Sequence, residues 1–223
     1  MQKFATAAPV SAVLDIPSGR IRFIAADRAD TTVEVLPADA SRSRDVRAAE
    51  QTGVSFADGV LRIAGPAAKN QLFGPSGAVE VTVQLPAGSR VEAKAAAAEL
   101  RGVGRLGDVT FEGAQATVKL DETASARLSV QAGDITVGRL GGDADIRTRK
   151  GELRIDEAVR GTVVLRTDAG EISVGAARGV SASLDAGTAY GRIRNSLRND
   201  VGSAAGLTIR ATTSYGDITA RSL

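Results

Sequence analysis

The sequence predicts an all-β protein: a parallel β-solenoid whose less regular, β-rich N-terminal portion acts as a cap. The first observation behind this prediction is a strand phrase, led by glycine, that recurs along the C-terminal part of the chain. The second is the make-up of the apolar residues. Of the 223 residues, 43% are hydrophobic but only 3% are aromatic. Small aliphatic residues suit closely stacked layers of strands better than a thick globular core.

The repeated phrase consists of a glycine, a polar residue, and then an alternation of aliphatic and polar residues. Its copies begin at Gly107, Gly133, Gly151, Gly170, Gly191 and Gly216. The middle copies lie about 18–21 residues apart, a spacing typical of solenoid rungs. Alternation with period two places the aliphatic residues on one face of a strand. We therefore expect each copy to be a strand that stacks on the next copy.

A second alternating segment and two turns separate successive copies. Thr stands three residues before the glycine at Thr148, Thr167, Thr188 and Thr213. A corner that turns within two or three residues needs a positive φ or a close backbone approach, and glycine supplies both. One such unit has too little apolar surface to fold alone, so stacking must bury the core.

The first 90 residues also contain strands, but they follow no regular repeat. Alternating runs lie at 12–16, 19–24, 32–36, 59–63 and 79–85. The polar, arginine-rich stretch 40–51 reads either as a loop or as one short helix. We interpret the chain as a single β-strand-repeat domain, 1–223, with an irregular N-terminal β region at 1–90 and solenoid repeats at 91–223. The N-terminal strands would cover the first rung, because a bare strand edge invites pairing with another chain.

Composition argues against several classes of function. The chain has no Cys and no His, which removes thiolate chemistry, the commonest general base and the commonest metal ligand. The formal net charge is only +2, so we expect no nucleic-acid partner. No run is long and apolar enough for a signal peptide or a membrane-spanning helix. The sequence thus predicts a non-enzyme in the cytoplasm, without cofactor, metal or membrane insertion.

One set of residues forms a candidate interaction surface. Arginines recur at polar-face positions of successive strands, and two tyrosines directly precede the repeat glycine in the last two units. The set is Arg147, Arg154, Arg166, Arg194, Arg210, Tyr190 and Tyr215. The arginines read as a solvated face of mixed charge, with a stripe that binds an anionic partner as the alternative. The tyrosines are expected to stack at one corner, with a sugar-binding platform as the alternative.

The segment 79–91, Val-Glu-Val-Thr-Val-Gln-Leu-Pro-Ala-Gly-Ser-Arg-Val, is followed by serial Gly-Asp-Ile-Thr-Val phrases. This combination resembles the bacterial putative-adhesin β-strand-repeat family, domain of unknown function 4097. The resemblance extends from about Val10 to Ile218. It implies a β-solenoid fold and supplies no catalytic residues.

The predicted function is that of a non-enzymatic, adhesin-like binding or scaffold module, with an unknown protein or a second copy as partner. One alternative is a self-assembling cytoplasmic scaffold built by end-to-end stacking, because the terminal strand at 217–220 has little chain beyond it to cover its edge. A further alternative is a carbohydrate-active β-helix enzyme, which would need a pair of carboxylates in a groove.

Overall fold

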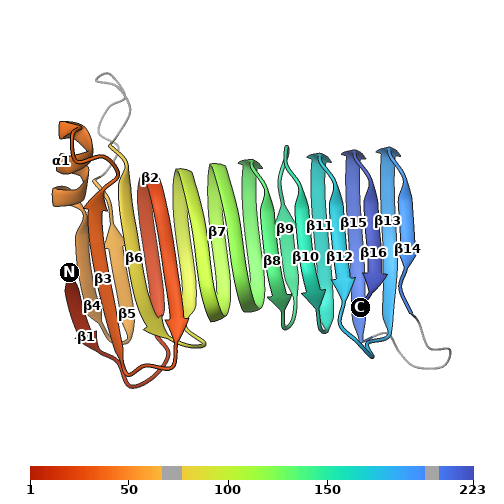
Figure 1. The fold of residues 1–223 in the computed structure, drawn as a ribbon, viewed down its shortest axis with the longest axis horizontal. Helices are drawn as coiled ribbons and strands as arrows, with labels where there is room; N and C mark the ends of the chain where they lie inside the picture. Colours follow the sequence, from red (N-terminus) through yellow and green to blue (C-terminus); the bar gives the residue numbers. More distant parts are fainter. Residues whose placement is uncertain (67–76, 199–205) are drawn as a thin grey trace.

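The computed structural model describes residues 1–66, 77–198 and 206–223. It is an elongated stack of strands with a short helix at its N-terminal end (Figure 1). The described strands join into one 16-stranded sheet that folds back on itself repeatedly. The all-β prediction is confirmed, and the fold is solenoid-like.

The elements of the N-terminal portion are β1 (Gln2–Ala5), β2 (Ser11–Ala26), β3 (Asp30–Pro37), α1 (Ser43–Gln51), β4 (Gly53–Ala57), β5 (Val60–Ala64) and β6 (Val79–Pro86). The remaining elements are β7 (Arg90–Ala132), β8 (Ile135–Leu140), β9 (Ala144–Arg147), β10 (Leu153–Ala158), β11 (Gly161–Ala169), β12 (Ile172–Ala176), β13 (Ala182–Tyr190), β14 (Ile193–Ser196), β15 (Leu207–Tyr215) and β16 (Ile218–Ser222). Long β7 winds around the stack, as Figure 1 shows.

Parallel strands form two layers. Layer A contains β6, the second half of β2, β8, β10, β12, β16 and β14. Layer B contains β5, the first half of β2, β9, β11, β15 and β13. β7 contributes strands to both layers. A rung is a strand of layer B together with the strand of layer A that follows it in the chain, such as β11–β12.

The core lies between the two layers and consists of aliphatic rows. One row in layer A runs through Val118, Ile135, Leu153, Ile172 and Ile218, which share one register position. Each of these side chains is 1% exposed. Burying one such side chain stabilises the fold by about 1.5–3 kcal/mol, so the rows give the stack most of its stability.

The corner between layers B and A explains the repeat glycine. Gly133, Gly151, Gly170 and Gly216 have φ values between +132° and +156° there. A Cβ on Gly170 would lie 1.9 Å from the carbonyl oxygen of Gly151 on the next rung. Both the backbone conformation and the close approach therefore require glycine.

The repeat threonines bond to the same corner. The Thr167 hydroxyl donates to the Gly151 carbonyl oxygen at 3.2 Å, and the Thr213 hydroxyl donates to the Gly170 carbonyl oxygen at 3.1 Å. Each threonine thus satisfies a buried carbonyl group at the corner of the neighbouring rung. This bond gives the spacing of three residues between Thr and Gly a physical reason.

The phrase at Gly107 lies at a different corner. The Gly107 amide donates to the Ser89 carbonyl oxygen at 2.8 Å, which places the phrase at the start of a layer-B segment of β7. Its grouping with the copies that open layer-A strands is wrong. Strands of both layers alternate with the same period, so the phrase alone does not distinguish one layer from the other.

At the N-terminal end, the strands beyond the parallel stack run in the opposite direction. β3 pairs antiparallel with β6, β1 pairs antiparallel with β3, and β4 pairs antiparallel with β5. The stretch 40–51, which the sequence left open between loop and helix, contains α1. This helix lies against β3 and β6.

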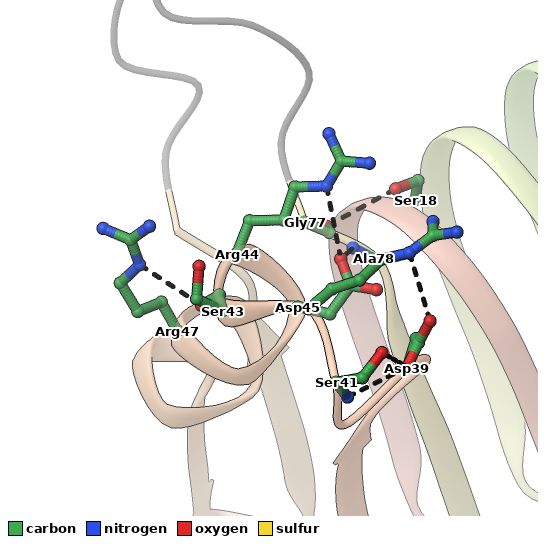
Figure 2. A network of polar contacts seen from close by, with 10 residues as sticks. Ser18, Asp39, Ser41, Ser43, Arg44, Asp45, Arg47, Gly77 and Ala78 are labelled. Carbon is green, nitrogen blue, oxygen red and sulfur yellow. Dashed lines mark hydrogen bonds and ion pairs between the residues drawn. The ribbon is translucent and has the colours of Figure 1, made fainter.

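A polar network attaches α1 to the stack (Figure 2). The buried Asp45 carboxylate accepts a hydrogen bond from the Ala78 amide at 3.0 Å, just before β6. Next to it, a Cβ on Gly77 would lie 2.2 Å from the Arg44 carbonyl oxygen, so the helix backbone packs directly on the strand entry. The Asp45 bond satisfies an amide at the entry of β6 and fixes the position of the helix.

At the C-terminal end, the order of rungs departs from the order in the chain. β15 pairs in parallel with β11 on one side and with β13 on the other. β16 lies in the same way between β12 and β14. Figure 1 shows β13 and β14 at the outer end and the β15–β16 rung inside them. The prediction that 217–220 is the terminal strand is therefore wrong, because β14 covers β16.

The inward residues give a reason for this order. In the β15–β16 rung, Ile209, Ile218 and Ala220 are all fully buried. The register partner of Ala220 on the outer rung is Asn195, which is exposed and accepts a hydrogen bond from the Leu197 amide. If β14 lay inside, the Asn195 amide would be buried among aliphatic side chains at a cost of about 1–3 kcal/mol. The more apolar rung occupies the inner position.

Candidate interaction surface

Three of the five candidate arginines lie on the outer face of layer B. Arg147 on β9 and Arg166 on β11 are direct register neighbours. Arg210 on β15 lies one register row away, between Val164 and Asp185. All three arginines are exposed. The arginines of layer B therefore form a cluster over three adjacent strands.

The other two arginines lie on the opposite layer. Arg154 on β10 has Thr136 and Ser173 as register neighbours, and Arg194 on β14 has Thr219. Arg154 pairs with Asp156 at 2.6 Å, and Arg194 lies 3.9 Å from Asp217. These two arginines do not extend the cluster on layer B.

Within the cluster, the arginines differ in their partners. Arg147 donates two hydrogen bonds to Asp145, at 2.8 and 2.7 Å, and these bonds raise the pKa of the Arg147 guanidinium above its usual value. Among the described residues, Arg166 and Arg210 have no carboxylate within ion-pair distance.

The two tyrosines stack at the corner, as the sequence predicts. The Tyr190 and Tyr215 rings lie 4.9 Å apart between centroids and are inclined by only 4°. The β13–β15 register sets Tyr190 opposite Tyr215, and the Gly216 amide bonds to the Tyr190 carbonyl oxygen. The rings remain 68% and 60% exposed. The backbone thus holds two aromatic rings in fixed positions at the surface.

The corner row continues beyond the tyrosines. Tyr215 pairs with Ala169, which is bridged to Lys150 and through it to Ala132. Tyr215 belongs to the same strand as Arg210, and Ala169 to the same strand as Arg166. Five of the seven candidate residues therefore lie on layer B or its corner: Arg147, Arg166, Arg210, Tyr190 and Tyr215.

A groove on the same layer was missed at the level of sequence. It encloses about 470 Å³ and lies nearer the N-terminal end. Its lining residues are Arg90, Val91, Glu92, Asp108, Val109, Thr110, Ser125, Ala126, Arg127, Asp143, Ala144 and Asp145. The alternation of charged and small residues in 90–94 and 125–129 was the available signal, but of the β7 segments that line the groove only the one after Gly107 begins with the repeat phrase.

Most carboxylates of the groove already have partners. Asp108 accepts hydrogen bonds from Ser125 at 2.7 Å and from Arg90 at 2.8 Å, and these bonds hold the pKa of the Asp108 carboxyl below its usual value. Asp143 accepts a bond from the Thr162 amide at 2.7 Å, and Asp145 holds Arg147. Three of the four carboxylates that line the groove are therefore already bonded to the protein, and Glu92 is the fourth.

Metal-binding and membrane-spanning features can be assessed for the described ranges. In 1–66, 77–198 and 206–223, no three Asp or Glu side chains are arranged to hold a metal ion. No helix in these same ranges is long and apolar enough to cross a membrane. The cytoplasmic location stays a prediction.

The fold and this surface define a solenoid-like β protein that holds rows of side chains on a stack of rungs. The chain belongs to the Toastrack DUF4097 family, whose profile matches residues 11–222. The resemblance noted from the sequence is thereby confirmed. No curated protein matches the sequence of this chain.

Several solved structures are similar to this chain at low identity. A putative cell adhesion protein from Clostridium sporogenes is 12% identical over 100% of this chain and 98% of its own, with a TM-score of 0.41. A putative adhesin from Bacteroides fragilis is 10% identical over 98% and 95%, with a TM-score of 0.49. A putative lipid binding protein from Parabacteroides distasonis is 11% identical over 98% and 95%, with a TM-score of 0.41.

Proposed function

We propose that this chain is a parallel β-solenoid, capped by its N-terminal strands and α1, that works as a non-enzymatic, adhesin-like binding module. Its contact surface is the outer face of layer B together with the tyrosine corner. The partner is a protein that presents carboxylates and apolar groups to this surface.

The observation that carries the proposal is the exposed tyrosine pair together with unpaired arginines on the adjacent strands β11 and β15. Tyr190 and Tyr215 are more than half exposed, and Arg166 and Arg210 carry no ion pair among the described residues. Tyr and Arg are the residue types that contribute most to binding at protein interfaces. A protein that leaves both types uncovered on one face has the composition of an interface on that face.

The rungs support binding by fixing the backbone positions from which these side chains extend. Arg147, Arg166 and Arg210 are held by continuous parallel pairing from β9 to β13. A surface that is already ordered loses little conformational entropy when a partner binds. Rigid presentation therefore favours affinity without any movement of the backbone.

Affinity capture with matched variants tests the proposal. The immobilised full chain would be compared with Tyr190→Ser/Tyr215→Ser and Arg166→Ser/Arg210→Ser, using Arg154→Ser on layer A as the control. We expect the Arg154→Ser control to capture the same proteins as the wild type, and both double variants to fail to capture them. Capture of the same proteins by all four chains would overturn the proposal.

A second candidate function is end-to-end assembly, which the open edge of the β13–β14 rung favours. Ile193 is 46% exposed there, and β13 has no described strand on its outer side. Because antiparallel strands cover the other end, this contact would join two copies head to head. Light scattering over a concentration series tests it, and a monomer at every concentration would count against it.

A carbohydrate-active enzyme has no comparable support. Such an enzyme needs two carboxylates free to act on a sugar between them. Of the four carboxylates that line the groove, Asp108, Asp143 and Asp145 accept hydrogen bonds from the protein itself, which leaves Glu92 without a second free carboxylate to pair with. We propose no catalytic role for the groove.

A further inference from the structure

The β15–β16 rung fills a slot between two rungs that precede it in the chain. Gly161 of β11 and Ala182 of β13 both pair with Leu207, and Ala169 and Tyr190 both pair with Tyr215. The two walls of the slot therefore have the same register. Either wall alone would align an incoming strand in the same way.

The contacts of the inserted rung are confined to the walls of this slot. β15 pairs with β11 and β13, and β16 pairs with β12 and β14. The side-chain bonds follow the same rule: the Thr213 hydroxyl bonds to Gly170, and Asp217 accepts a bond from the Arg192 amide at 2.9 Å. The rung is thus a unit with two identifiable neighbours and no described bond to earlier rungs.

The stabilisation of this unit comes from residues that only the slot can bury. Leu207, Ile209, Ala211, Ile218 and Ala220 are each at most 1% exposed. Every one of these contacts would be the same if the rung came from another molecule of the same chain. Exchange of an identical element costs little for this reason, since only the connection between elements changes.

We propose that β15–β16 is an exchangeable rung, and that the slot between β11–β12 and β13–β14 accepts the β15–β16 rung of a second copy. The product is a dimer in which each chain completes the stack of the other. The interaction surface is the slot itself, and its partner is residues 207–222 of a second molecule. This dimer is distinct from the head-to-head pair, because it places β15 of one chain beside β11 of the other.

Cysteine pairs can report the origin of the rung, because the chain has no cysteine of its own. Arg166 and Thr212 are outward register neighbours on β11 and β15, at a separation that a disulfide can bridge. Two full-length chains, one with Arg166→Cys and one with Thr212→Cys, would be unfolded together, refolded at increasing concentration and oxidised. We expect a disulfide-linked band of twice the monomer mass that grows with the concentration during refolding.

Two controls separate exchange from other outcomes. The Arg166→Cys/Thr212→Cys double variant must form its disulfide within one chain at low concentration, which verifies the rung order. Lys94→Cys and Glu112→Cys, on neighbouring turns of β7 whose side chains form an ion pair, form the second mixture. We expect no disulfide between those two chains. If the Arg166/Thr212 mixture gives no more linked dimer than the Lys94/Glu112 mixture at any concentration, the exchange proposal is wrong.

Discussion

The two ends of the stack deal with their open strand edges in different ways. At the N-terminal end, antiparallel β3 and β4 cover the first parallel strands, and Asp45 attaches α1 to the entry of β6. The described C-terminal end has neither antiparallel strands nor a helix over its last rung. The chain places the polar β13–β14 rung outermost and inserts the apolar β15–β16 rung beneath it.

This contrast shows that position in the stack depends on side chains as well as on chain order. Leu184 on the outer rung and Ile209 on the inner rung are register partners, yet only Ile209 is fully buried. The outer rung has the polar Asn195 at an inward position, where it can stay in contact with water. The inner rung has Ala220 at the same position, and this apolar side chain is buried. The outer rung can protect the edge because it is the more polar of the two.

The largest expected difference concerns glycine. Gly216→Ala puts a methyl group about 2.1 Å from the Gly170 carbonyl oxygen, at a φ of +149°. We expect the free energy of unfolding to fall by at least about 3 kcal/mol, because a strained backbone and a clash act together. Gly187 on the outer rung has open space around it, so Gly187→Ala should change stability by less than about 1 kcal/mol. Urea unfolding measures both, and equal losses would contradict the comparison.

The next difference concerns burial. Ile209→Ala should lower the free energy of unfolding by about 2–4 kcal/mol, because it removes buried methylene groups and leaves a cavity. Leu184→Ala on the outer rung should cost less than about 1.5 kcal/mol, since water reaches that side chain already. Denaturant unfolding of the two variants is the measurement. A larger loss for Leu184→Ala would mean that another molecule covers the outer rung in solution.

A smaller difference is expected for the corner threonines. Thr213→Val removes the hydroxyl hydrogen bond of a residue that is only 3% exposed, so we expect a loss of about 1 kcal/mol. Thr188 makes the equivalent bond to the Gly216 carbonyl oxygen at 3.0 Å, but it lies on the outer rung. Thr188→Val should therefore cost less than Thr213→Val. Thermal unfolding compares the two, and a reversed order would argue against the inner position of β15.

The smallest expected effect is a loss of stability in acid that is confined to the N-terminal end of the stack. Hydrogen bonds from Arg28 and then Lys3 lower the pKa of Asp30 from 3.8 to about 2. The folded state thus gains stability from this carboxylate above pH 3.8 and loses it as the pH falls from 3.8 toward 2. Native-state hydrogen exchange should show β1 and β3 opening in this range before the C-terminal rungs. Asp30→Asn should remove the pH dependence at β1, and an unchanged profile would refute the assignment.

Much of this architecture could be predicted from the sequence, because its causes are local. The glycines at 151, 170 and 216 recur with threonines three residues earlier, and both are explained by contacts at one corner. The stacking of Tyr190 on Tyr215 followed from their equivalent places in two units. Where the repeat units can be aligned in the sequence, residues at equivalent positions can be predicted to lie side by side on neighbouring strands.

Two features could not be predicted because their causes are not local. The rung order depends on which inward residues tolerate water, and a repeat with constant phase allows β13 or β15 to lie beside β11 equally well. The groove depends on the path of β7 between residues 90 and 132, where the repeat phrase occurs once, at Gly107, and opens a layer-B segment. Arg127 was missed for the same reason, because its segment of β7 does not begin with a repeat glycine.

The insertion of β15–β16 between earlier rungs also determines when the C-terminal end can fold. A ribosome makes β13–β14 before β15–β16, yet β13–β14 finds its place only on the outer side of the later rung. Rungs up to β11–β12 can form one after another as the chain emerges. The last two cannot, because they must close a longer loop together. The end of the stack farthest from α1 is therefore expected to fold after synthesis and to limit the rate at which the whole protein folds.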